Sequence, residues 1–424
     1  MGLKSLFPPN PPLRLGEGDW GGMVFASSTP SPGPFSEAVR GRKTARVCFV
    51  IDRLSRAGTE SQLLALIRNL DRTRVEPTLC LLNGQDDESR ALLPTDCPMI
   101  DLGLIRLLGG RAMSAAIKLR AFWERHRVNI VQAYFLDSAY FSLPLARLCG
   151  IQHTIRVRNN SGYWLTARHR WLGRMLGRLV TTLSNSEIAR QAVIEAERLN
   201  PSRVRVIENG VDLDRFQNVQ PPDTATPLVR IGAVANLRQV KNIDGLIRVA
   251  ASICKTHPQT RFLVAGEGGE RPQLEAKIRH LGLSGRFELI GSVEDVPGFL
   301  ADLDIAVNCS HSESMSNAVL EYMAAGRAIV ATDVGAHGLL IRNELEGLVV
   351  AATDDAALEL AIRRYLLEPI FARSCAYSAR VRAERDFSRL VMVREFEEFF
   401  ASLLQKKRPA RTGAVLVKLS NSDS

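Results

Sequence analysis

Two glutamates in one segment are candidate ligand-binding groups. Glu313 and Glu321 lie in CSHSESMSNAVLEYMAAG (309–326), where an apolar strand pattern gives way to a polar loop and then to a helical pattern. If the helix opens near Met315, eight residues at ~1.5 Å of rise separate the two carboxylates by ~12 Å. This spacing is too long for the paired carboxylates of a glycoside hydrolase, but it suits a site that holds both ends of an extended ligand.

The start of the same helix is a candidate site for phosphate or ribose oxygens. The first amides of a helix have no partner within the helix, and here they belong to Ser314, Met315, Ser316 and Asn317. On spacing alone a second interpretation stays open, in which Glu313 only complements the helix dipole and Glu321 is an ordinary surface acid.

The elements that must position these residues alternate between strand and helix patterns. Short apolar runs predict strands at 46–51, 75–82, 129–133, 153–157, 179–184, 203–207, 229–234, 260–266, 286–291, 304–309, 328–332 and 347–351. Helical spacing separates them at 60–70, 112–126, 138–148, 186–198, 243–256, 271–281, 316–325, 355–366 and 388–404. This alternation predicts an α/β fold with two doubly wound, Rossmann-like parallel sheets and a ligand in the cleft between them.

Composition and turn residues divide the chain into six predicted parts. Its 424 residues, 46% of them hydrophobic, give room for two cores and exclude a wholly disordered chain. The predicted parts are a disordered Pro/Gly/Ser-rich leader (1–44), a first domain (45–215), a linker (216–228), a second domain (229–385), a helix crossing back to the first domain (386–404) and a basic tail (405–424).

The cysteine pattern and the hydropathy of the chain argue against structural zinc and against a membrane-spanning protein. Seven cysteines without a CxxC pair predict reduced, mostly buried thiols in the cytosol and no structural zinc. No stretch approaches the ~20 apolar residues that a membrane-spanning helix needs.

The positive charge of the chain is unevenly spread. The net charge is +10, yet between Arg106 and Arg178 thirteen basic side chains face only two acidic ones, Glu124 and Asp137. Such a field attracts anionic partners such as acidic lipid headgroups or phosphorylated substrates. The alternative is that these arginines are ordinary surface residues on solvent-exposed helix faces and bind no partner. We expect no nucleic-acid partner because no recognisable nucleic-acid module accompanies the basic residues.

Several ordered segments resemble glycosyltransferase family 4, whose members are retaining transferases of the GT-B fold that use nucleotide-activated sugars. Glu313 and Glu321, followed by MAAG (323–326) and ATDVGAHG (331–338), resemble the EX7E region of that family. Further matching segments are IDRLSRAGTESQ (51–62), LSNSEIARQAV (183–193), RVIENGVDLDRF (205–216), VANLRQVKNIDGLI (234–247) and FLVAGEGGERPQLE (262–275). The resemblance runs from about Arg46 to Leu404.

The resemblance implies roles for the residues of the second domain. Glu321 is expected to bind the ribose hydroxyls, Glu313 to hold the transferred sugar and Lys241 to neutralise the donor diphosphate. The family usually places an arginine five residues before that lysine. Here this donor-side position is Asn236, and Arg238, three residues before the lysine, is expected to supply the charge.

Other expected site residues flank this group. The backbone around Val293 resembles the family segment that contacts the nucleobase. Gly58 has no side chain, so a phosphate can approach its backbone closely. The alternative for Gly58 is an ordinary turn at the start of a helix. Arg158 stands where many family members have a histidine, so it is an acceptor-side candidate that cannot act as a base. His153, five residues upstream, is expected to be structural.

Taken together, the resemblance implies a retaining hexosyltransferase of the GT-B fold. It would move a sugar from a nucleotide-diphosphate sugar to a glycan or lipid-linked acceptor in cell-surface, extracellular polysaccharide or lipopolysaccharide synthesis, without a cofactor or an essential metal. We expect it in the cytoplasm, with peripheral contact at the anionic inner face of the membrane through the helices that carry Arg111–Arg127 and Arg168–Arg178.

Two alternatives keep the cleft but change the function, namely a non-catalytic sugar-nucleotide-binding or membrane-scaffold GT-B protein and a GT-B-type sugar-nucleotide epimerase. A Rossmann oxidoreductase is disfavoured because Arg271 replaces the third glycine of its fingerprint.

Overall fold

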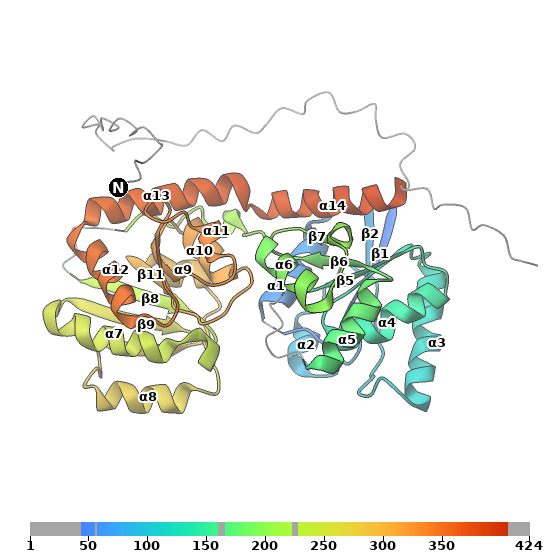
Figure 1. The fold of residues 1–424 in the computed structure, drawn as a ribbon, viewed down its shortest axis with the longest axis horizontal. Coiled ribbons are helices and arrows are strands. Elements are labelled where there is room, and N and C mark those ends of the chain that lie inside the picture. The colour runs from blue at the N-terminus through green and yellow to red at the C-terminus, as the bar shows by residue number, and fades with distance from the viewer. Residues whose placement is uncertain (1–43, 56, 160–165, 223–227, 406–424) are drawn as a thin grey trace, which may run out of the picture. The chain divides into compact units, whose positions relative to one another are not determined.

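The structure is a computed structural model that describes residues 44–55, 57–159, 166–222 and 228–405. These residues form two α/β domains, each built on one parallel sheet (Figure 1). The predicted leader and basic tail lie outside the described residues except for Thr44 and Gln405, as does part of the predicted linker. Within the described ranges, no helix combines the length and the apolar character needed to span a bilayer.

The first domain has seven parallel strands in the order β3-β2-β1-β4-β5-β6-β7. They are β1 (Ala45–Ile51), β2 (Val75–Leu81), β3 (Met99–Asp101), β4 (Ile130–Ala133), β5 (His153–Val157), β6 (Thr181–Ser184) and β7 (Val204–Val206). The helices between them are α1 (Gly58–Asn69), α2 (Asp87–Ala91), α3 (Gly110–Arg125), α4 (Leu136–Leu148), α5 (Ala167–Gly177) and α6 (Glu187–Glu197). Strand β1 is apolar on both sides because helices cover both faces of the sheet.

The second domain has six parallel strands in the order β10-β9-β8-β11-β12-β13. They are β8 (Val229–Val234), β9 (Thr260–Ala265), β10 (Phe287–Gly291), β11 (Ile305–Asn308), β12 (Ala328–Thr332) and β13 (Leu348–Val350). Its helices are α7 (Ile243–Thr256), α8 (Arg271–His280), α9 (Val296–Ala301), α10 (Asn317–Ala324), α11 (His337–Leu340), α12 (Asp355–Leu367) and α13 (Pro369–Asp386), with a short 3-10 helix η3 at Gln239–Lys241.

The strand order reverses once in each sheet. In the first domain the reversal lies between β1 and β4, and in the second it lies between β8 and β11. At such a point the two flanking loops leave the carboxyl ends of the strands in opposite directions, which opens a crevice suited to a ligand. The loops after β8 and β11 are the ones that carry Lys241 and Glu313.

The last described helix, α14 (Arg389–Gln405), belongs to the core of the first domain. Phe400 is fully buried, and its ring lies edge-on to that of Phe49 in β1, with the centroids 6.2 Å apart. Glu397, also buried, pairs with Arg74 at 2.6 Å. The chain therefore returns to its first domain after completing the second.

The predicted fold of two doubly wound α/β domains is confirmed. The helices and the strand that the sequence did not predict have weak apolar patterns, for two reasons. Helices α2, α9 and α11 and strand β3 are too short to show a period in the sequence. Helix α13 is long, but its buried face consists of small residues such as Ala376, Ala379 and Ala383, so its apolar pattern is weak.

Candidate active site

Lys241 and Glu313 form an ion pair across the switch point of the second sheet. The ammonium group of Lys241, at the end of η3, donates to Oε1 of Glu313 in the loop after β11. The side chains are 24% and 12% exposed, so both groups are screened from bulk water yet still open to the surface. The Ser310 hydroxyl donates a second hydrogen bond of 2.9 Å to the same carboxylate oxygen.

The loop after β12 fixes the backbone around Glu313. Gly335 has a φ of +54°, and a Cβ at this position would overlap the carbonyl oxygen of Glu313. The next amide, that of Ala336, donates a 2.7 Å hydrogen bond to the carbonyl of Ser314. Only glycine combines this backbone conformation with such a close approach, so the ATDVGAHG segment positions Glu313.

Helix α10 begins at Asn317, two residues after Met315, where the spacing estimate placed its start. Ser316 is its N-cap, and the Ser316 hydroxyl accepts from the amide of Val319 at 3.4 Å and from the side chain of Asn308 at 3.0 Å. Met315 therefore lies before the helix, buried, with its sulfur 3.1 Å from the amide of Asn209. The estimate of ~12 Å between the two glutamates assumed helix from 315 onward, so it does not apply to the loop.

Asn317 connects the start of α10 to the first domain. Its side-chain nitrogen donates to the carbonyl of Gly58 at 3.2 Å, and its oxygen accepts from Asn209 at 2.8 Å and from Gln62 at 3.1 Å. A Cβ on Gly58 would lie 2.9 Å from that nitrogen. The structure thus brings together Gly58 and Asn317, two residues that sequence reasoning placed in the site separately.

Ser314 makes a second link between the domains. Its hydroxyl donates to Oδ1 of Asn185, after β6, at 2.6 Å. The contributions of Asn185, Gln62 and Asn209 were not predicted, although all three lie in the segments 51–62, 183–193 and 205–216 that resemble the family.

Glu321 is a partly buried acid, and no hydrogen bond or ion pair to its carboxylate is found among the described residues. Burial raises the pKa of Glu321 to about 7, although Arg215 and Arg389 oppose the shift through their positive charge. A carboxyl group held this way has unused acceptor capacity, and a strongly perturbed pKa makes Glu321 a candidate functional residue.

His337 is a residue near the site that was not predicted. Its ring is fully buried, with Nδ1 2.7 Å from the carbonyl of Thr332, so Nδ1 must carry the proton because a carbonyl only accepts. Burial lowers the pKa of His337, which keeps the ring neutral. Its Nε2 has no partner within the described residues.

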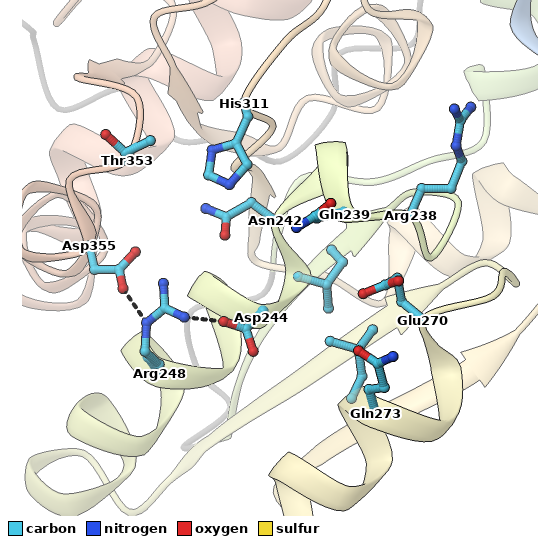
Figure 2. A pocket seen from close by; sticks show the side chains of 12 residues that line it. Arg238, Gln239, Asn242, Asp244, Arg248, Glu270, Gln273, His311, Thr353 and Asp355 are labelled. Carbon is cyan, nitrogen blue, oxygen red and sulfur yellow. Dashed lines mark hydrogen bonds and ion pairs between the residues drawn. The ribbon is translucent and has the colours of Figure 1, made fainter.

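A polar pocket of about 350 Å³ lies beside the Lys241 loop (Figure 2). Arg248 lines it and is held by Asp244 and by Asp355, the latter at 2.5 Å. Figure 2 shows Arg238, also a lining residue, directed away from this ion-pair group.

Asn236 and Val293 follow β8 and β10, the two strands that flank β9 in the second sheet. Asn236 is exposed in the loop after β8, and Val293 is half-buried in the loop after β10. A Cβ at Gly266 would overlap the carbonyl of Ala235, so the glycine loop after β9 packs against the loop of Asn236. These loops share one edge of the sheet, where a nucleotide is expected.

Arg158 lies in a buried ion cluster. Its guanidinium donates to Glu197 at 2.9 Å, and the same carboxylate also pairs with Arg156. Burial lowers the pKa of Arg158, while Glu197 acts in the opposite direction. The acceptor role of Arg158 stays a prediction, and two of the thirteen basic residues counted between 106 and 178 are buried.

A metal site has no support in the part of the chain that the structure describes. There, no group of three or more His, Cys, Asp or Glu side chains is placed to hold a metal ion. All seven cysteines are free, and five of them are buried. That the reaction proceeds without a metal remains a prediction.

Family models of glycosyltransferases match both Rossmann-like domains. The family model of the group 1 glycosyl transferases matches residues 215–382, and that of glycosyltransferase family 4 matches residues 56–215. The two matches adjoin and together cover more than half of the chain, which belongs to this family of glycosyltransferases.

Known proteins agree with this assignment. The chain is 28% identical over 294 residues to the lipopolysaccharide core biosynthesis mannosyltransferase LpcC of Rhizobium leguminosarum bv. viciae, covering 66% of this chain and 77% of that protein. It is 23% identical over 300 residues to an Escherichia coli UDP-Gal:alpha-D-GlcNAc-diphosphoundecaprenol alpha-1,3-galactosyltransferase, covering 66% and 75%. Anabaena HepE in complex with UDP superposes with a TM-score of 0.75 at 17% identity, covering 84% of this chain and 100% of that one, so the GT-B fold is shown.

Proposed function

We propose that this glycosyltransferase is a retaining enzyme that moves a sugar from a nucleotide-diphosphate sugar to a glycan or lipid-linked acceptor. The observation that carries the proposal is the Lys241–Glu313 pair at the switch point, next to the first turn of α10. A cation, an anchored carboxylate and a helix N-terminus in one crevice match the diphosphate and the hydroxyls of such a donor.

The diphosphate is assigned to Lys241 and the start of α10. The ammonium group has three donors and uses one on Glu313, so it can still bind a phosphate oxygen. Arg238 is exposed on the same loop and supplies a second positive charge. The positive end of the α10 dipole acts in the same direction.

The two glutamates are assigned to hydroxyl groups. Glu321 has an unused carboxylate for the ribose, and Glu313 lies beside the diphosphate-binding cation, where the transferred sugar must be. The loop of Val293 and the glycine loop after β9 flank the nucleobase. Because the HepE structure contains UDP, uracil is the first nucleobase to test, with UDP-sugars as donors.

The transfer breaks the bond between the anomeric carbon and the terminal phosphate oxygen and forms one between that carbon and an acceptor hydroxyl oxygen. The nucleoside diphosphate leaves with the electron pair, and it takes the proton released by the acceptor hydroxyl. Lys241 and Arg238 stabilise the negative charge that grows on the leaving group.

The acceptor is assigned to the first domain. The names of two relatives, a lipopolysaccharide core mannosyltransferase and a diphosphoundecaprenol galactosyltransferase, support cell-surface glycan synthesis and a lipid-linked acceptor. Such acceptors are made at the inner face of a membrane, which fits the basic helices of the first domain. The alternatives of an epimerase and a non-catalytic binding protein have less support, because the family matches are to glycosyltransferases.

Release of the nucleoside diphosphate from a panel of UDP-, GDP- and ADP-sugars tests the proposal, with lipid-linked and soluble glycan acceptors added in turn. The wild type should turn over at least one donor with retention of anomeric configuration. Glu313→Gln should lose most of this activity, whereas Glu288→Gln, an exposed acid on β10, should not. Inversion of configuration, or full activity of the Glu313 variant, would contradict the proposal.

A further inference from the structure

One face of the first sheet is covered by three helices in a row. Helices α3, α4 and α5 share a single apolar core with strands β1, β2 and β4 (Figure 1). Helix α4 is connected to the end of α5 because Arg147 donates a 2.8 Å hydrogen bond to the carbonyl of Leu179. The outward sides of these helices therefore belong to one layer.

Helix α5 and the turn that follows it carry exposed apolar side chains. Trp171 and Met175 lie one turn apart on α5, and Leu179 lies in the turn two residues after the helix ends; the three are 60%, 46% and 53% exposed. Side chains at this spacing lie above one another on one side of a helix. Leu148, at the end of α4, is also exposed, next to Arg147.

Basic side chains surround these apolar residues, and acidic ones are missing from α5. Arg168, Arg170 and Arg178 are exposed, and no acidic residue occurs in α5. Arg174 is half-buried, so it contributes less to the surface. A helix with Trp and Leu beside arginine, and with no acid, has the composition of a helix that lies in a membrane interface.

Helix α3 repeats the pattern at the other end of the layer. Met113 and Ile117 are exposed one turn apart, and Ile105 and Leu108 are exposed in the segment that leads into the helix. Arg111 and Lys118 are exposed on the same helix. Its single acid, Glu124, is paired with Arg120 at 2.7 Å, so it opposes the positive field only weakly.

A second exposed apolar cluster provides a contrast. Leu367 and Ile370, where α12 meets α13, are each 71% exposed, but Glu368 lies between them. On α3 and α5, exposed apolar and basic side chains occur together with Glu124 as the single acid of the two helices, so charge complementarity favours an anionic partner with an apolar interior.

We propose that the outward face of α3 and α5 lies on an anionic lipid bilayer, with Trp171, Met175 and Leu179 inserted at the boundary between headgroups and acyl chains. This inference rests on the proposed function for its setting, an acceptor held at a membrane. It adds an apolar contact to the peripheral attachment through basic helices that the sequence predicts, so part of the binding persists at high salt.

Flotation of the full chain tests the proposal, using phosphatidylcholine vesicles with and without phosphatidylglycerol. The apolar variant is Trp171→Gln/Met175→Gln/Leu179→Gln, and the basic variant is Arg168→Gln/Arg170→Gln/Arg178→Gln. The matched control is Leu367→Gln/Ile370→Gln, which changes an equally exposed apolar pair.

The wild type should bind vesicles that contain phosphatidylglycerol and keep a fraction bound at high salt. The basic variant should lower partitioning by ~100-fold, given three charges near the surface. The apolar variant should lose the salt-resistant fraction, and the control should bind like the wild type. Brominated lipid should quench the fluorescence of the wild type more than that of Trp171→Gln.

Three results would overturn the proposal, namely equal binding to neutral and anionic vesicles, equal quenching of both proteins, or displacement of the protein from vesicles by RNA homopolymer. Release of nucleoside diphosphate from a soluble donor, measured without vesicles, should be the same in all variants. Failure of vesicle binding with intact turnover therefore counts against this surface alone, and loss of turnover in the wild type counts against the proposed function.

Discussion

The ammonium group of Lys241 and the carboxylate of Glu313 are hydrogen-bonded, although the residues are 72 positions apart in the chain. They come from the loops after β8 and β11, the two strands on either side of the reversal in strand order. The order of strands in the sheet therefore places them together, and each group holds the other in the crevice.

Replacing Lys241 with alanine should weaken binding of the sugar nucleotide by about 10–100-fold, because a charge-assisted hydrogen bond contributes roughly 1.5–3 kcal/mol. Isothermal titration with the nucleoside diphosphate measures the effect. Lys255→Ala, at an exposed position near the end of α7, is the control and should bind normally. If both variants bind the nucleoside diphosphate equally well, Lys241 does not bind the diphosphate.

Glu321→Gln should stabilise the protein at alkaline pH while it abolishes donor binding. Because the pKa of Glu321 is raised from 4.5 to about 7, the folded state holds the proton more firmly than the unfolded state does. Between these two values the free energy of unfolding of the wild type falls as the pH rises. The full shift, from 4.5 to about 7, corresponds to roughly 3 kcal/mol, and partial exposure reduces the expected effect to about 1–2 kcal/mol.

Urea unfolding at pH 8 and at pH 4.5 checks this prediction. The Gln variant should be more stable than the wild type at pH 8, and the two should converge at pH 4.5. Glu288→Gln should show no such crossover. A variant that is less stable than the wild type at pH 8 would show that the Glu321 carboxylate has a stabilising partner.

Gly335→Ala should lower both stability and turnover, because the new methyl group meets the carbonyl of Glu313 in a left-handed backbone conformation. We expect a loss of about 1–3 kcal/mol in the free energy of unfolding and a lower kcat. Gly269→Ala is the matched control, since a Cβ there has nothing within 4 Å. Normal turnover in the Gly335 variant would mean that the loop can move without displacing Glu313.

Arg158→Gln separates a structural role from an acceptor role. The variant leaves the Arg156–Glu197 pair in place, so its melting temperature should change little. Glu197→Gln leaves two buried guanidinium groups without a carboxylate and should cost about 3–5 kcal/mol. If Arg158 contacts the acceptor, the rate of sugar transfer by Arg158→Gln should fall below that of the wild type while donor hydrolysis continues. If the variant carries out both reactions at wild-type rates, Arg158 has only a structural role.

Local sequence patterns were sufficient for the fold, whereas the roles of the individual site residues stay predictions and most contacts between those residues could not be predicted. Strands such as β8 and helices such as α7 follow from apolar periods, and their predicted bounds match those observed. The link from Asn317 to Gly58 could not be predicted in this way, because it joins residues 259 positions apart through a side-chain amide. Arg158 shows the opposite limit: its sequence position suggests an open cleft, yet its charge is used by a glutamate on a distant helix.

The place of α14 in the first core has a consequence for how the chain folds during synthesis. The first domain leaves the ribosome before the second, yet Met392, Phe396 and Phe400, which complete its core, are made after the last strand of the second domain. Until then the groove for α14 against β1 and α1 exposes apolar side chains to the cell. The first domain can therefore complete its core only after the second domain has been synthesised. A chain that is truncated before residue 389 has a first domain with exposed apolar side chains, which makes it prone to aggregation.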